Sequence, residues 1–113
     1  MKTITKLAFQ GDVCFIRVDA LPEGVIDSTP DGEIIVAFSE THHHHSLSPG
    51  EARLFEKLER DPMVCYLAID GDHADVVHHR STHTHETVRL LRGLWEVRRQ
   101  REHTPEGWRR VAD

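Results

Sequence analysis

Glycine, proline and aspartate divide this chain into short runs that are rich in β-branched and aromatic residues. The clearest run is residues 62–69, and the turn signal Asp-Gly-Asp at 70–72 separates it from a second run at 74–80. Runs of this length between turn residues are typical of β-strands. Many short strands with glycine and proline turns favour a sandwich or a barrel, so we predict an all-β fold. Further strands are expected at 12–18, 33–39, 87–91 and 94–100, with Arg92-Gly93 as a hairpin or tight corner.

The segment 49–60 fits two kinds of secondary structure. Ser48 followed by Pro49 and by Glu51 has the composition of a helix start with a capping box. The apolar residues of 52–58 also alternate in a way that fits a strand with one buried face. The sequence leaves helix and strand open here, with a strand slightly favoured in a β-sandwich.

The C-terminal tail carries a second helix signal. Thr104 precedes Pro105, which matches a capping residue followed by proline at the first helical position. We predict a short helical turn that packs Trp108 and Val111 on the sheet.

Length and composition favour a single domain over residues 1–113. Apolar residues make up 38% of the 113 residues and charged residues 29%, which is a globular composition with enough apolar surface for one core. No segment approaches the length of a transmembrane helix, and the opening residues lack the apolar stretch of a signal peptide. We therefore expect a cytoplasmic protein with no membrane partner, whose Cys14 and Cys65 are reduced.

Histidine is the outlier of the composition, at ten residues of 113. Residues two apart on a strand face the same side, so His43 projects with His45, and His83 with His85. Imidazoles converging from two strands suit zinc, copper, iron or nickel. Such tracts also occur as solvated loops that bind metal only incidentally. For His73 and His103 we expect surface positions.

The pattern His43-x-His45, then Glu51, then a later histidine resembles the metal-binding signature of the cupin superfamily. The stretch 83–97, which turns at Gly93, is similar to a cupin strand pair. The resemblance implies a small cupin-like jelly-roll barrel or sandwich that holds a metal with the His-x-His pair, a carboxylate and a further histidine. Glu51 comes one residue later than the cupin spacing favours.

Most of the chain is also similar to a family of small bacterial, phage and plasmid proteins. The resemblance lies in the opening Gln10-Gly-Asp-Val, in a histidine tract after a strand, and in the ending at 97–106. In that family the tract often reads Thr-Gly-His-x-His, which maps onto His43 and His45, and a histidine before the last hairpin maps onto His85. We therefore predict His43, His45 and His85 as metal ligands, with His83 or His79 as a candidate for a fourth position.

The leading functional hypothesis is a mononuclear metal-dependent oxidoreductase that uses oxygen or peroxide. An all-imidazole ligand set keeps two oxidation states accessible, so copper or iron is favoured as the one divalent transition metal, with zinc or nickel as the other options. The substrate would be a small molecule, with a carbohydrate as one candidate. Tyr66, Trp95 or Trp108 would offer it a stacking face, although core packing is favoured for each. Small jelly-roll domains commonly pair through sheet edges, so we expect a homodimer.

Two other hypotheses remain. The first is an accessory factor that binds nucleic acid or protein through Arg98, Arg99 and Arg101 together with Arg109 and Arg110. The formal charge of −5 counts against nucleic acid, and on a strand Arg99 shares a face with Trp95 while Arg98 shares one with Glu96. The second is a metal-stabilised structural protein without activity.

Overall fold

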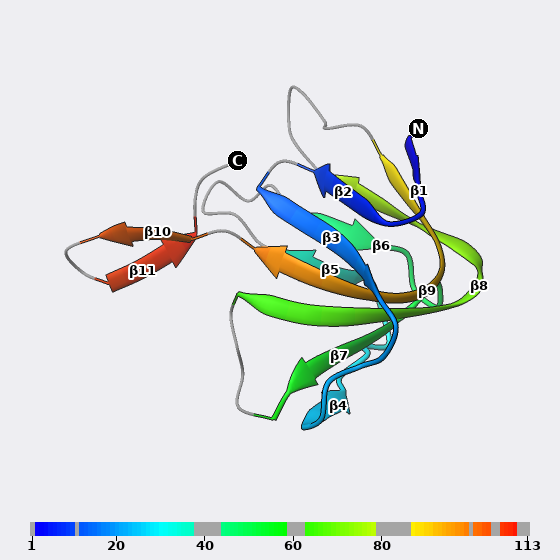
Figure 1. Cartoon of the computed structure of the whole chain (residues 1–113), viewed down its shortest axis with the longest axis horizontal. Helices are drawn as coiled ribbons and strands as arrows, with labels where there is room; N and C mark the ends of the chain where they lie inside the picture. The colour runs from blue at the N-terminus through cyan, green and yellow to red at the C-terminus, as the bar shows by residue number, and fades with distance from the viewer. Residues whose placement is uncertain are drawn as a thin grey trace.

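In the computed structural model the protein is all-β, as the sequence predicts (Figure 1). The structure describes residues 2–10, 12–37, 44–58, 63–78, 87–99, 101–104 and 107–110, the last two ranges by their backbone. Within these ranges every regular element is a strand. None of the described residues forms a helix long and apolar enough to cross a membrane.

Nine strands form one sheet, which is open and not a closed barrel. The hydrogen-bonded order is β2-β3-β9-β8-β6-β5, with β1 also paired to β9, and β7 paired to both β8 and β4. All pairs are antiparallel except β1 with β9. The strands are β1 (Lys2–Ile4), β2 (Leu7–Gln10), β3 (Val13–Val18), β4 (Val25–Asp27), β5 (Ile34–Ala37), β6 (His45–Leu47), β7 (Arg53–Lys57), β8 (Val64–His78) and β9 (Val88–Arg99).

The long ribbon of β8 and β9 is the spine of the sheet, and it curves strongly along its length (Figure 1). Its register runs from Val64 opposite Arg98 to Val76 opposite Val88, with a bulge between Ile69 and His73. The predicted turn at 70–72 is therefore wrong. The strand continues because β9 offers it a partner on both sides of the bulge. Arg92-Gly93 is a corner within one strand, which is one of the two predicted forms.

The bulge in β8 changes which residues face the core. Before it, all residues from 65 to 69 are buried, but only the odd-numbered Cys65, Leu67 and Ile69 belong to the apolar core. After it, the even-numbered Ala74, Val76 and His78 are buried. Strand β9 shows the matching change, from even-numbered to odd-numbered buried residues, around Gly93. Residues 70–72 of β8 lie opposite Arg92 alone, so β8 has two more residues than β9 at this corner, and the inward face changes in both strands there. The inward residues join one apolar core that includes Phe15, Ile34, Val36, Leu47, Leu90, Trp95 and Val97.

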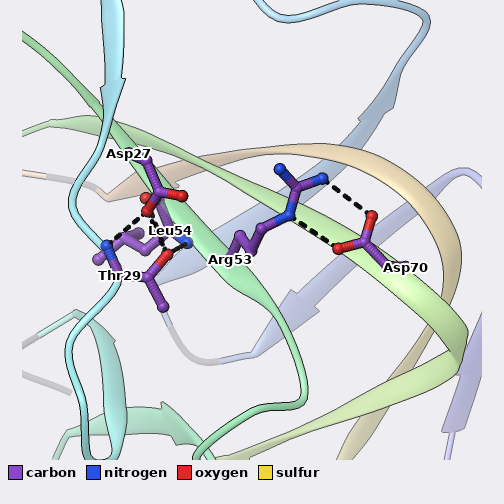
Figure 2. Close-up of polar contacts among 5 residues, drawn as sticks. All are labelled: Asp27, Thr29, Arg53, Leu54 and Asp70. Atoms are coloured by element: carbon purple, nitrogen blue, oxygen red, sulfur yellow. Dashed lines mark hydrogen bonds and ion pairs between the residues drawn. The ribbon is translucent and has the colours of Figure 1, made fainter.

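Strand β7 settles the open choice at 49–60 in favour of a strand for residues 53–57. The Glu51 N–H donates to the Ser48 carbonyl, and Gly50 takes a φ of 81°, so these residues form a turn and not the first turn of a helix. Figure 2 shows how β7 is held on both sides: Arg53 pairs with Asp70 of β8 through two hydrogen bonds of 2.8 and 2.9 Å. On the other side, the Leu54 N–H donates to the Thr29 hydroxyl at 2.8 Å.

The C-terminal segment is a hairpin, which corrects the expected helical turn. Strands β10 (Arg101–Thr104) and β11 (Gly107–Arg110) pair antiparallel as a separate two-stranded sheet. Thr104 pairs with Gly107, so only two residues connect the strands. A two-residue connection is the commonest β-hairpin loop, and here that geometry prevails over the capping signal of Thr104 and Pro105.

Candidate metal centre

The candidate site lies where β6 begins and β8 ends. His45, the first residue of β6, and His78, the last residue of β8, are direct cross-strand partners. The segment 38–43, which carries His43, leads into this point, and the segment 79–86 leaves from it. Both predicted histidine clusters are therefore adjacent in sequence to this one cross-strand pair. The predicted ligands His43 and His85 lie outside the described residues, as do the candidates His79 and His83.

His45 and His78 are both fully buried, each with 0% exposure. Their rings are stacked, with centroids 3.9 Å apart and planes 3° from parallel. Histidine is seldom fully buried, and a buried polar ring is stable only where its surroundings satisfy its polar atoms. Two fully buried histidines side by side are therefore unusual in the interior of a small domain.

Gln10 joins β2 to the histidine pair from across the interior. Its side chain is 2% exposed and takes the inward position next to Ala8, whereas Leu7 and Phe9 point outward. Its Oε1 lies 2.8 Å from Nδ1 of His45, and its Nε2 donates to the Val76 carbonyl at 2.8 Å. One amide side chain thus bridges β2, β6 and β8.

Asp12 places a carboxylate near the buried ring of His45. It directly precedes β3, its side chain is 13% exposed, and its Oδ1 lies 3.9 Å from Nε2 of His45. Two ligand atoms that each lie about 2.1 Å from one metal are about 3.0–4.2 Å apart, depending on the angle at the metal. The separation of these two atoms falls within that range. A carboxylate oxygen and an imidazole nitrogen also form a common donor pair for first-row transition metals.

Glu51, the carboxylate suggested by the cupin comparison, has a different role. Its Oε2 accepts a hydrogen bond from the Asp75 N–H at 3.0 Å. Asp75 lies three residues before His78 in β8, which is about 10 Å along the strand. Its side chain pairs with Arg89 through two hydrogen bonds of 2.9 and 3.1 Å. Glu51 therefore anchors the turn before β7 to β8.

His44 follows the alternation expected of the histidine tract and turns to different partners from those of its neighbour His45. Its Nε2 lies 3.4 Å from Oε1 of Glu33. The other carboxylate oxygen of Glu33 accepts a hydrogen bond from the Ser46 hydroxyl at 2.9 Å. The surface position expected for His73 is confirmed.

The arginines of β9 are engaged within the fold. Arg98 pairs with Glu96 at 2.6 Å, and this exposed contact holds the pKa of Arg98 above its ordinary value. Arg99 is only 8% exposed and donates to the Val36 carbonyl at 2.9 Å. Arg99 thus shares the buried face of Trp95, as predicted. The side chains of these two arginines are thus held by partners within the chain.

Two of the three aromatics considered as a stacking face are core residues. Trp95 is 0% exposed and its Nε1 donates to the Leu91 carbonyl at 2.9 Å, and Tyr66 is 5% exposed. The side chain of Trp108 lies outside the described residues. Core packing, the favoured role for each aromatic, is confirmed for Trp95 and Tyr66.

Three residues of this site were not predicted: Gln10, Asp12 and His78. Gln10 occupies an inward position in the alternating stretch 7–10, where an apolar residue is expected, and that irregularity is a signal of a buried polar contact. His78 continues the inward series of Ala74 and Val76. Asp12 has no signal of its own, because its proximity to His45 arises only when β2 folds across β6.

Among the described residues, no group of three or more histidine, cysteine, aspartate or glutamate side chains is arranged to hold a metal. The described part of the site is the pair of His45 and Asp12, with Gln10 and His78 around the imidazole. No match was found among curated proteins, and none among solved structures. Residues 9–100 match a family described as a domain of unknown function, DUF8820. The match covers most of the chain, including β3 to β9 and the whole described site, so this protein belongs to the DUF8820 family.

Proposed function

We propose that the protein binds a single transition metal at the end of the sheet where β6 meets β8. The observation that carries the proposal is the 3.9 Å separation between Nε2 of the buried His45 and Oδ1 of Asp12. His43 and His85 complete the ligand set in this proposal, with His83 or His79 as a further ligand. The segment with His43 precedes His45, and the segment with His85 follows His78. Both segments are short enough in sequence for their histidines to reach the neighbourhood of this pair.

We further propose that the bound metal is copper or iron and that the protein is an oxidoreductase. Copper or iron with imidazole ligands can alternate between two oxidation states and so exchange electrons with oxygen or peroxide. The protein's own contribution is positional: the interior holds His45 rigidly, and Asp12 adds a negative charge that stabilises a cation. A carbohydrate remains one candidate substrate.

The decisive measurement is the metal content of untagged protein, with titration calorimetry of the apo form with Cu²⁺ and Zn²⁺. We expect about one metal per chain for the unmodified protein, as for a single mononuclear site. His45→Ala, His43→Ala and His85→Ala should each lose most of the affinity, and Asp12→Asn should lose part of it. The matched control is His73→Ala, which removes an exposed histidine and should bind normally. Equal binding by the His45→Ala and His73→Ala variants would refute the site.

Activity is tested separately from binding, because a metal can also serve only to stabilise a fold. Metal-dependent consumption of peroxide or oxygen that disappears in His45→Ala would support an oxidoreductase. A melting temperature that falls on chelation, with no such turnover in the loaded protein, would identify a structural metal instead.

The proposal includes a homodimer. Strand β2 ends the hydrogen-bonded order of the sheet, and edge strands are the usual route by which sheets pair. Light scattering should then give twice the chain mass of 13.0 kDa. A species of 13.0 kDa at high protein concentration would exclude the dimer.

A further inference from the structure

We infer that Gln10 is a positioning residue that fixes the tautomer of His45, with the hydrogen on Nδ1 and the lone pair on Nε2, the nitrogen on the side of Asp12. The tautomer follows from the hydrogen bonds alone. Its use in metal binding rests on the proposed function.

The first step is the orientation of the Gln10 amide. One end of this amide lies 2.8 Å from the carbonyl oxygen of Val76. A carbonyl oxygen can only accept a hydrogen bond, so the amide nitrogen of Gln10 must be at this end. The amide oxygen is thereby directed at His45.

The second step is the proton on His45. The amide oxygen of Gln10 can only accept, and it lies 2.8 Å from Nδ1 of His45. Nδ1 must therefore carry a hydrogen. In the neutral imidazole the other nitrogen, Nε2, then has no hydrogen, and its lone pair lies on the side of Asp12. Because free histidine in water favours a hydrogen on Nε2, the fold selects the opposite form.

The third step is the chemical use of this arrangement. A histidine that binds a metal usually donates its second ring N–H to an oxygen, which orients the ring and makes the ligating nitrogen more basic. Gln10 supplies such an oxygen from β2, and its own position is held by the backbone of β8. The stack on His78 keeps the ring in one plane. Rotation of the His45 ring by half a turn would place a carbon atom against the amide oxygen and lose the hydrogen bond.

The test separates Gln10 as a selector of the tautomer from Gln10 as a filler of a polar core. Gln10→Glu keeps an acceptor toward Nδ1, whereas Gln10→Leu keeps the approximate volume and removes the acceptor. Long-range ¹H–¹⁵N correlation spectra of the apo protein at about pH 8, above the ordinary titration range of histidine, report which ring nitrogen carries the hydrogen. We expect Nδ1–H for His45 in the unmodified protein and in Gln10→Glu, and a shift toward Nε2–H in Gln10→Leu.

Metal titration provides the second readout. With Zn²⁺ as the probe, Gln10→Leu should bind about 10–100-fold more weakly than the unmodified protein, and Gln10→Glu should bind at least as tightly as Gln10→Leu. An Nε2–H signal for His45 in the unmodified apo protein overturns the inference, and this result does not depend on whether either variant folds. An Nδ1–H signal in a protein that binds no metal leaves the tautomer assignment standing and defeats the proposed function instead.

Discussion

The imidazole of His78 lies flat against that of His45, with ring centroids 3.9 Å apart and planes 3° from parallel. The two residues come from opposite strands and meet because His45 is the cross-strand partner of His78. Rings stacked at this distance are in van der Waals contact. Each ring therefore limits the positions that the other can take, which matters for any ligand that His45 binds.

Replacement of His78 with alanine should destabilise the fold. The change removes a fully buried ring and its stack on His45, and it leaves a cavity beside the His45 ring. Buried large-to-small substitutions of this size cost about 2–4 kcal/mol of the free energy of unfolding. Urea denaturation would measure the loss, with exposed His73→Ala as the control, which should change by less than about 0.5 kcal/mol. Equal stabilities for the two variants would show that the stack contributes nothing.

Alanine at Gly93 should also be destabilising, for a backbone reason. Gly93 has a φ of 143°, which L-residues rarely adopt, and an added Cβ would lie 2.9 Å from Nη2 of Arg17. That guanidinium donates to the Arg92 carbonyl at 2.7 Å, so the displaced arginine would lose a hydrogen bond as well. We expect a loss of about 1–3 kcal/mol in thermal or urea unfolding. The matched control is Gly71→Ala, because a Cβ there meets nothing within 4 Å.

Asp75 should make stability depend on pH on the acid side. Its hydrogen bonds from Arg89, and then the charge of that guanidinium, hold the pKa of the carboxyl below its ordinary value of 3.8. A group whose pKa is lowered by folding stabilises the protein above the unfolded value and loses that contribution as pH falls through the folded value. Unfolding at a series of pH values below about 5 should therefore show a shallower decline in stability for Asp75→Asn than for the unmodified protein.

The same pair can be observed directly from the other side. Arg89→Gln should return the pKa of Asp75 toward its ordinary value, since the guanidinium is the main cause of the shift. Titration of the Asp75 carboxyl carbon by NMR measures this. An unchanged Asp75 titration in the variant would contradict the assigned cause.

Trp95→Phe should lower the stability by removing one buried hydrogen bond and part of the ring volume. The indole is fully buried and donates to the Leu91 carbonyl across the corner of β9. Loss of the bond and of part of the ring volume should lower the free energy of unfolding by about 1–3 kcal/mol. Trp95→Leu should cost more, because it also removes the aromatic volume, and a smaller loss for leucine than for phenylalanine would show that volume is not the determining factor.

The sequence predicted the class of the fold and the positions of β3, β5, β8 and β9, because β-branched runs and turn residues act locally. It did not predict the short strands β1, β2, β4 and β6 or the C-terminal hairpin. It did not predict that β8 passes through Asp70-Gly-Asp without reversing. Those three residues form a turn when a strand has no partner beyond them, but here β9 continues alongside and pairs on both sides of the bulge. The same reason explains Gly93, which bends a strand where a hairpin was one of two expectations.

The sequence predicted His45 as a site residue from its spacing within the histidine tract, and the structure buries this side chain completely. Gln10 and Asp12 were not predicted because their contacts with His45 bridge more than 30 positions of the chain and arise from tertiary folding alone. The cupin comparison directed attention to Glu51, whose carboxylate instead binds the backbone of Asp75. Long-range polar contacts of this kind leave no periodic signal in a single sequence.

The bulge at 70–72 also decides which of two neighbouring side chains can enter the site. If β8 kept the alternation of Leu67 and Ile69 without interruption, Val77 would point into the interior and His78 would point to the outside. Deletion of a single residue at this corner should therefore turn the Val77 side chain inward and the His78 side chain outward. The side chain that reaches the interior at the end of β8 therefore depends on the alternation of the strand, which changes at the corner several residues earlier.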